Sequence, residues 1–262
     1  EEVLCWTMWQ TDTGTGGAVE RAMVLPGVGE DAVYYHIRRS IGGADDSYTK
    51  VLLHFEGEDA STSIIDSNAG GSARIWTANG NAQLDRAQRK FGRSSLLCDG
   101  TGDWVYTPDS ADFALGTSDF TVDFWFNCNA AGGANARLCG QTDASGTAAG
   151  SAFYLHRHSS NVIEAQISDG SSFTAVQGTT QFTNLLNTGW HHLALVRTGN
   201  TLKLFLDGTQ EGSSTAFTGT IPNSSADFAV GARSSDASTP NPWTGWIDEF
   251  RLSVGIARWT AN

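Results

Sequence analysis

The clearest strand pattern in this chain is Asp119-Phe120-Thr121-Val122-Asp123-Phe124-Trp125-Phe126-Asn127. Its large apolar residues Phe120, Val122, Phe124 and Phe126 recur at every second position, which is the period of a β-strand. Thr121, Asp123 and Trp125 then face the opposite side. Burial of one such side chain contributes roughly 1.5–3 kcal/mol, so the apolar side of this strand is expected to line a core between sheets.

Further strand-like runs follow from Tyr48 onward, separated by turns and spaced as in an antiparallel sandwich. They are residues 50–55, 73–77, 95–98, 103–107, 119–127, 152–156, 162–167, 173–176, 190–197, 201–206, 226–231 and 244–253. Gly199-Asn200 suits a tight turn, so 190–197 and 201–206 are predicted to form a hairpin. Asp207-Gly208 follows the alternating leucines of 202–206 and supplies the positive φ angles that the next tight turn requires.

Composition indicates an all-β protein and excludes several classes of function. The chain has 30 glycines, nine tryptophans and 17% charged residues, which is typical of short strands joined by many turns. A net charge of -12 argues against a nucleic-acid partner, because such a protein needs a basic surface. No apolar stretch approaches the ~20 residues that cross a bilayer, so membrane insertion is not expected.

The four cysteines, Cys5, Cys98, Cys128 and Cys139, form no C-x-x-C pair, which argues against a zinc site. Most of them fall in strand-like runs, so buried free thiols are expected. A bridge between Cys128 and Cys139 across a turn stays open as the alternative.

Residues 1–44 are predicted to be separate from the sandwich. Three alternating runs, 3–10, 18–25 and 32–41, are divided by glycine-rich breaks, which is typical of a β meander. About 40 residues bury little core alone. We therefore expect residues 1–44 to be the end of an upstream domain, and residues 45–262 to form the sandwich.

With the strands placed, seven short motifs resemble, in order, the laminin-G-like family of concanavalin A-type domains, particularly the version of phage tail and bacterial surface proteins. The motifs are 52–57, 90–96, 99–105, 119–125, 189–194, 204–208 and 245–252. The resemblance implies a jelly-roll β-sandwich. The first 43 residues more weakly resemble the closing strands of phage tail-hub or nozzle proteins, through Cys5-Trp6, 24–27, 30–35 and 38–43.

Together these resemblances imply a non-catalytic carbohydrate-binding or adhesion module of a virion structural protein, located in a phage tail or on another extracellular surface. Its expected partners are a host or cell-surface glycan, other virion subunits and further copies of itself. A purely structural decoration domain without a glycan ligand is the alternative. A glycan-cleaving enzyme is disfavoured, because adjacent strand residues such as Asp248-Glu249 point to opposite faces and cannot flank one glycosidic bond.

A calcium ion is the expected cofactor, if the module uses one. Ca²⁺ takes six to eight oxygen ligands, and Glu56, Asp66 and Asp248 are the candidate ligands. By resemblance, the first and last strands of the sandwich are neighbours, which would bring Asp248 to the 56–66 loop. The family usually has Asp where this chain has Glu56, which puts a copied geometry in doubt. The alternative is that these carboxylates cap turn amides.

Sugar recognition would use aromatic rings in loops with polar groups beside them. Trp76, Trp104 and Trp243 are the candidate rings, of which Trp104 and Trp243 are preferred. Asp103, Asp236 and Asn241 are the candidate polar neighbours. The alternative is that Trp104 belongs to the core and that Trp243 seals the end of the sandwich.

Overall fold

The computed structural model describes residues 18–25, 32–38, 46–233 and 241–260. The chain divides into two compact units, Glu1–Asp46 and Ser47–Asn262. In the first unit, β1 (Ala18–Leu25) pairs antiparallel with β2 (Ala32–Arg38). Two of the three predicted meander runs are therefore strands, and the run 3–10 lies outside the described residues. Within the described part of the chain, no helix is long and apolar enough to cross a membrane.

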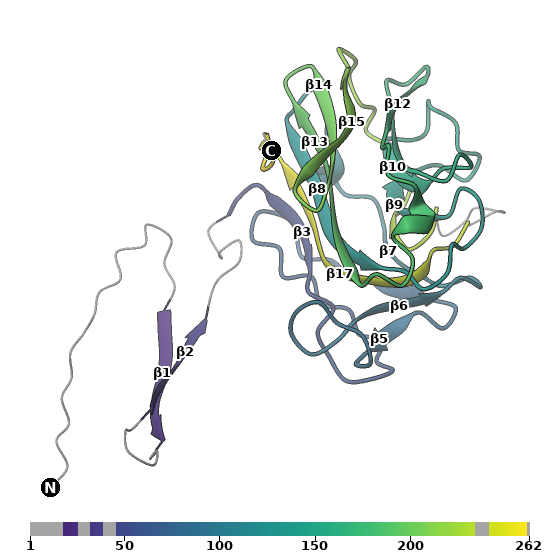
Figure 1. Cartoon of the computed structure of the whole chain (residues 1–262). Helices are drawn as coiled ribbons and strands as arrows, with labels where there is room; N and C mark the ends of the chain where they lie inside the picture. The colour runs from purple at the N-terminus through teal and green to yellow at the C-terminus, as the bar shows by residue number, and fades with distance from the viewer. Residues whose placement is uncertain (1–17, 26–31, 39–45, 234–240, 261–262) are drawn as a thin grey trace, which may run out of the picture. The chain divides into compact units, whose positions relative to one another are not determined.

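Two antiparallel sheets make up the second unit and enclose its core, which confirms the predicted all-β jelly-roll sandwich (Figure 1). The strand order is β12-β11-β10-β9-β16-β7-β4 in the seven-stranded sheet. The order is β15-β14-β13-β8-β17-β6-β5 in the eight-stranded sheet, where β3 also pairs with β17. Two short 3-10 helices, η1 (Ala111–Phe113) and η2 (Phe182–Asn184), lie in the connections.

The seven-stranded sheet contains β4 (Thr77–Asn79), β7 (Trp104–Thr107), β9 (Arg137–Gln141), β10 (Phe153–Arg157), β11 (Ile163–Ser168), β12 (Phe173–Gln177) and β16 (Phe228–Val230). The eight-stranded sheet contains β3 (Thr49–Leu53), β5 (Gln83–Asp85), β6 (Ser95–Asp99), β8 (Phe120–Asn127), β13 (Trp190–Thr198), β14 (Thr201–Leu206), β15 (Thr209–Ala216) and β17 (Thr244–Val254).

The core lies between the two sheets and contains the apolar stripe of β8. Phe120, Val122, Phe124 and Phe126 are all 0% exposed, which confirms the predicted inward face. Phe124 stacks on Phe250 of β17 with ring centroids 5.5 Å apart. Phe120 contacts Phe153 of β10 in the opposite sheet at 6.1 Å. The stripe therefore holds together both its own sheet and the two sheets.

Both predicted turns are present. β13 and β14 form the expected hairpin, with Leu195 opposite Leu204. Asp207 and Gly208 have φ values of 50° and 81°, and they connect β14 to β15. The positive φ angles match the right-handed twist of the strands that the turn joins.

Four parts of the strand prediction differ from the structure. Residues 73–76 were expected in a strand, but β4 begins at Thr77. β5 was not expected, and neither were β9 and β15. Their sequences Arg-Leu-Cys-Gly-Gln and Thr-Gln-Glu-Gly-Ser-Ser-Thr-Ala contain glycine and few β-branched or aromatic residues, so intrinsic preference does not favour strands there. Pairing with neighbouring strands overrides that preference.

Cys98, Cys128 and Cys139 are buried free thiols, while Cys5 lies outside the described residues. Burial raises the pKa of the Cys128 thiol to about 12. A thiol with so high a pKa is a poor nucleophile, so these cysteines contribute packing and not chemistry.

Candidate functional site

The outer face of the seven-stranded sheet carries a continuous row of paired residues across neighbouring strands. From β7 to β12 the row runs Tyr106, Ala229, Gly140, Tyr154, Gln166 and Ala175. The residues next to them along the strands, including Val105, Cys139, Leu155 and Val176, lie in the core. Because successive side chains of a strand alternate between faces, the row points outward.

The middle of this row has small residues, and aromatic residues lie on either side of them. Gly140 and Ala229 bring no side chain beyond a methyl group, while Tyr106 and Tyr154 stand on either side of them. Tyr106 also packs against a small apolar cluster of Trp104, Ala229 and Ala232 on the same face. Flat rings beside small residues are an arrangement that suits a flat, partly apolar ligand.

A β-bulge turns Arg137 onto this face. Leu155 pairs with Cys139, but His156 pairs with Arg137, so the register shifts by one residue. Strict alternation from the buried Cys139 would direct Arg137 into the core. The bulge instead aligns it with Tyr154 and His156, since a bulge re-aims the side chains that follow it. The Arg137 guanidinium carbon lies 3.2 Å from the centroid of the Tyr154 ring.

A second row lies beside the first and is polar throughout. It consists of Arg137, His156, Glu164 and Gln177, paired in turn across β9, β10, β11 and β12. His156 Nε2 lies 3.1 Å from Glu164 Oε1, and Gln177 Nε2 donates to Glu164 Oε2 at 2.9 Å. Gln166 of the first row also donates to Glu164. Glu164 is thus held by a histidine and two amides.

Burial determines the charge states of these groups. It lowers the pKa of His156, although the hydrogen bond to Glu164 opposes the shift, so the ring is neutral at pH 7. Burial also acts to raise the pKa of Glu164, but hydrogen bonds from His156 and Gln166 outweigh it and lower that pKa. Glu164 is therefore ionised and accepts the Nε2–H of His156. Burial lowers the pKa of Arg137 to about 10, which leaves the guanidinium charged.

Several buried polar atoms of this face have no hydrogen-bond partner. They are Arg137 Nε, Arg137 Nη1, His156 Nδ1 and Trp104 Nε1. Arg137, His156 and Trp104 are 8%, 4% and 6% exposed. A buried polar group that lacks a partner costs about 1–3 kcal/mol, and native folds satisfy nearly all of them. Donors on Arg137 and Trp104, together with an acceptor on neutral His156, suit a ligand rich in hydroxyl groups.

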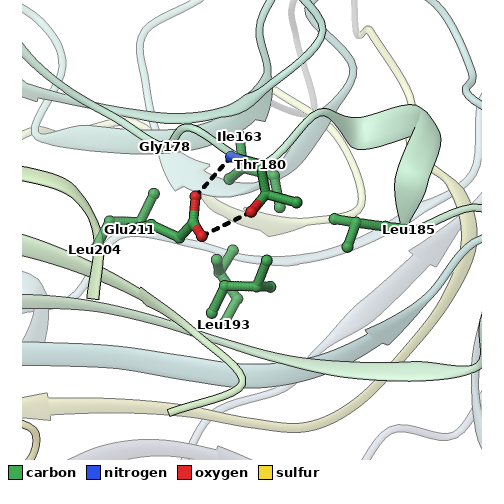
Figure 2. A pocket seen from close by; sticks show the side chains of 8 residues that line it. Ile163, Gly178, Thr180, Leu185, Leu193, Leu204 and Glu211 are labelled. Carbon is green, nitrogen blue, oxygen red and sulfur yellow. Dashed lines mark hydrogen bonds between the residues drawn. The ribbon is translucent and has the colours of Figure 1, made fainter. Parts of the chain in front are cut away.

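A separate small pocket lies at one edge of the sandwich (Figure 2). It is lined by Ile163, Gly178, Thr180, Leu185, Leu193, Leu204, Leu206 and Glu211. The Glu211 carboxylate, its charged group, accepts hydrogen bonds from the Thr180 N–H and Oγ1, each at 2.8 Å. The pocket walls are otherwise mostly leucine and isoleucine. We regard this pocket as a packing feature of the sandwich edge and not as a ligand site.

A comparison with protein families identifies the fold. Residues 99–255 match the family model described as the concanavalin A-like lectin/glucanases superfamily. The chain belongs to the concanavalin A-like lectin/glucanase superfamily. This confirms the predicted laminin-G-like and concanavalin A-like resemblance. No curated protein sequence matches the chain.

Solved structures of this superfamily fold include several binding domains. The binding domain of Paraclostridial Mosquitocidal Protein 1 matches with a TM-score of 0.59 and 13% identity over 80% of this chain and 49% of that one. The binding domain of botulinum neurotoxin serotype D gives 0.58 and 12% over 80% and 49%. Domain 4 of AbnA, an extracellular GH43 arabinanase from Geobacillus stearothermophilus solved in complex with arabinotriose, gives 0.54 and 18% over 80% and 93%. The chain thus spans about half of the toxin domains and nearly all of the arabinanase domain.

The three carboxylates predicted to bind calcium are not assembled into one site. Glu56 accepts hydrogen bonds from the Arg93 N–H, and Asp248 accepts from the N–H groups of Lys90 and Phe91. These two therefore fasten the same 90–93 segment. Asp66 is engaged elsewhere, with the N–H groups of Leu52 and Asn68 and with Trp76 Nε1.

In this fold, the oxygens of these three carboxylates are not arranged as ligands of one calcium ion. Their oxygens are occupied by N–H donors, which is the turn-capping role given as the alternative. Within the described residues, no three His, Cys, Asp or Glu side chains are placed to hold a metal ion. Burial raises the pKa of Asp248 to about 7, and the nearby charge of Glu249 adds to this. A bound cation would lower that pKa, so calcium binding stays a prediction that titration can test.

The predicted sugar-binding tryptophans are buried. Trp243 is 1% exposed and packs edge-on against Phe126 and Phe182, so it seals the core as the alternative stated. Trp104 is 6% exposed, although it does lie on the outer face described above. Neither presents an open ring at the surface. The prediction that both rings are displayed for stacking is therefore wrong, because packing against neighbouring aromatic and small residues covers them.

The polar residues predicted to accompany these rings have structural roles or lie outside the described part. Asp103 is 1% exposed and accepts hydrogen bonds from the N–H groups of Asn81 and Asp99. The carbonyl of Asn241 accepts from the Arg137 N–H at 2.8 Å, which connects it to β9. Asp236 lies outside the described residues. Trp76 is buried, and it contacts Phe228.

The residues of the two outer rows were not predicted from the sequence, above all Arg137, Tyr154, His156 and Glu164. One signal was available. The predicted strands 152–156 and 162–167 alternate apolar residues with Tyr154, His156, Glu164 and Gln166, a run of hydrogen-bonding side chains on one face. Arg137 had no such signal, because β9 was not predicted and a bulge decides its direction.

Proposed function

We propose that this domain is a non-catalytic carbohydrate-binding module, and that the saccharide lies across the outer face of the seven-stranded sheet. The observation that carries the proposal is the set of buried polar atoms without partners on Arg137, His156 and Trp104. They stand beside the Tyr106 and Tyr154 rings. Sugar hydroxyls both donate and accept hydrogen bonds, and sugar C–H groups pack on aromatic rings.

The surroundings of Glu164 support binding over hydrolysis. A glycosidase of the common kind uses two carboxyl groups that flank the scissile bond. Both oxygens of Glu164 are engaged by His156, Gln166 and Gln177. The neutral imidazole and the two amides hold the ionised Glu164 in place, which suits fixed recognition.

The structural relatives also support a binding function. The arabinanase domain was solved with arabinotriose, and this chain covers 93% of that domain. The toxin relatives are named as binding domains. The wider setting that the sequence suggests, an adhesion module in a phage tail with several copies and other virion subunits around it, belongs to this proposal. It rests on the resemblance of the motifs quoted above.

Glycan-array binding of the 262-residue chain tests the proposal. Wild type should bind at least one saccharide class, and Tyr106→Ala and Gln166→Ala should each weaken that binding about tenfold or more. Phe91→Ala is the matched control, because Phe91 is an exposed aromatic residue that contacts Trp125 of the other sheet. Binding by wild type that both face variants retain would move the site elsewhere. No binding to any saccharide would favour the structural decoration domain.

A further inference from the structure

The polar row of the outer face contains an unbalanced positive charge. Arg137 is buried, and among the described residues no carboxylate forms an ion pair with it. The charge of Glu164 raises the pKa of Arg137, but the oxygens of Glu164 are hydrogen-bonded to His156, Gln166 and Gln177. A charged group taken out of water without a partner is costly, so this arginine is a feature that needs an explanation.

A second arginine adds to the positive character of this place. The charge of Arg233 lowers the pKa of Arg137, and both arginines lower the pKa of Tyr154, although burial raises that pKa overall. Of the two guanidinium groups, that of Arg137 lies over the tyrosine ring. The whole chain has a net charge of -12, so this locus stands out against its surroundings.

The guanidinium of Arg137 is also held in one orientation. Its carbon lies 3.2 Å from the centre of the Tyr154 ring, and that ring is contacted edge-on by Phe173 at 5.4 Å. The backbone N–H of Arg137 donates to the Asn241 carbonyl at 2.8 Å. Its Nε and Nη1 have no hydrogen-bond partner. Nε shares one edge of the guanidinium with Nη2, and an edge of this kind matches the two oxygens of a carboxylate.

We infer that the saccharide which this face binds carries a carboxylate, as in a uronic or sialic acid, and that the guanidinium of Arg137 receives it. The inference rests on the proposed function and adds the class of sugar. The tyrosine rings and the amide of Gln166 would contact the neutral part of the same ligand. Arg137 is thus the residue that sets specificity, and the rings and amides supply contacts common to acidic and neutral sugars.

Matched pairs of probes test this inference. Trigalacturonic acid is compared with its fully methyl-esterified form, and 3′-sialyllactose with lactose, by titration calorimetry on the whole chain. The acidic member of at least one pair should bind about tenfold tighter than its neutral counterpart or more, because a charge-assisted bidentate contact away from water is strong. Arg137→Met should remove the preference and leave the weaker neutral binding. Arg137→Lys, which keeps the charge without the fork, should keep only part of it.

Arg93→Met is the matched control. It removes the same charge from an exposed position whose backbone hydrogen-bonds to Glu56, and it should leave the preference unchanged. A measurement on wild type covers the case in which Arg137 variants do not fold. The acidic probes should protect Arg137 from modification by phenylglyoxal, read by mass spectrometry, and the neutral probes should protect it less.

The outcomes separate the two levels of the proposal. Equal affinity for acidic and neutral probes, or a preference that survives Arg137→Met, overturns the inference and leaves a neutral-sugar module. Acidic probes that bind without protecting Arg137 also overturn it. An absence of binding to every probe, neutral and acidic, together with an empty glycan array, overturns the proposed function itself.

Discussion

Replacement of Glu211 by alanine should open one edge of the sandwich. Glu211 belongs to β15 of the eight-stranded sheet, and its Oε2 accepts from the N–H groups of Thr179 and Thr180, each at 2.8 Å. Its Oε1 accepts from Thr180 Oγ1 at 2.8 Å (Figure 2). Thr179 and Thr180 follow β12 of the opposite sheet. One carboxylate therefore joins the two sheets at their edge strands β12 and β15.

The size of the effect follows from these bonds and from the exposure of the carboxylate. A hydrogen bond to a charged group contributes about 1.5–3 kcal/mol when it is buried. Glu211 is half-buried, and the freed N–H groups can reach water, so we expect Glu211→Ala to cost about 2 kcal/mol in total. For a unit of this size, that corresponds to a decrease in Tm of roughly 4–8 °C. Glu211→Gln should cost about half as much, since the amide oxygen still accepts.

Urea denaturation followed by tryptophan fluorescence measures this change, because seven of the nine tryptophans belong to the second unit. Glu58→Ala is the control, since Glu58 forms an exposed ion pair with Arg86 and such pairs contribute little. If Glu211→Ala unfolds within about 0.5 kcal/mol of wild type, the usual range of surface substitutions, the joining role of this carboxylate is refuted.

The contribution of Glu211 also has a defined pH dependence. Burial acts to raise its pKa, but hydrogen bonds from Thr180 and Thr179 outweigh it, and the pKa in the folded state is lower than the ordinary value. The folded state thus favours the ionised form. The stabilisation is fully present above the unfolded pKa of about 4.3 and is lost as the pH falls through the lower folded value. The stability difference between wild type and Glu211→Gln should therefore shrink as the pH falls below about 4.

Three further predictions concern the eight-stranded sheet. Asp123→Ala should cost roughly 3–5 kcal/mol, because buried Asp123 pairs bidentately with Arg251 at 2.9 and 2.7 Å; a urea midpoint no lower than that of Glu58→Ala would contradict this. Burial raises the folded pKa of Asp248 to about 7, so wild type should lose stability as the pH rises from about 4 to 7. In urea titrations at each pH, Asp248→Asn should lack this decrease in the free energy of unfolding. A slope equal to wild type would assign the pH dependence to other groups. Gly208→Val should cost about 1–3 kcal/mol by thermal melting, since φ is 81° there, and Thr209→Val should be near neutral.

The sandwich itself could be predicted because its main strands repeat with a period of two. The stripe from Phe120 to Phe126 and the leucines of 202–206 both lie in the core as expected. The hairpin between β13 and β14 was predictable for a local reason, since Gly199 adopts the positive φ of 55° that its tight turn requires. These features depend on neighbours in sequence, so a single chain is enough to find them.

The candidate site could not be predicted in the same way. Trp104 and Trp243 were sensible candidates, because aromatic rings near loops are typical of sugar-binding surfaces. Their burial is decided by what packs on them, including Ala229 and Ala232 in one case and Phe126 and Phe182 in the other. Those contacts join residues more than 50 positions apart in the chain, as with Phe182 and Trp243.

The amino-acid sequence alone determined the all-β class, the inward face of β8 and the turns that join β13, β14 and β15, because each follows from local alternation or from a local φ requirement. The tertiary structure decided the face on which Arg137 lies and the groups that meet there. A one-residue bulge in β9 reverses the direction of that side chain, and cross-strand pairing places it beside Tyr154 and His156. Register between strands is a non-local property, since it is set by the joint burial of many side chains.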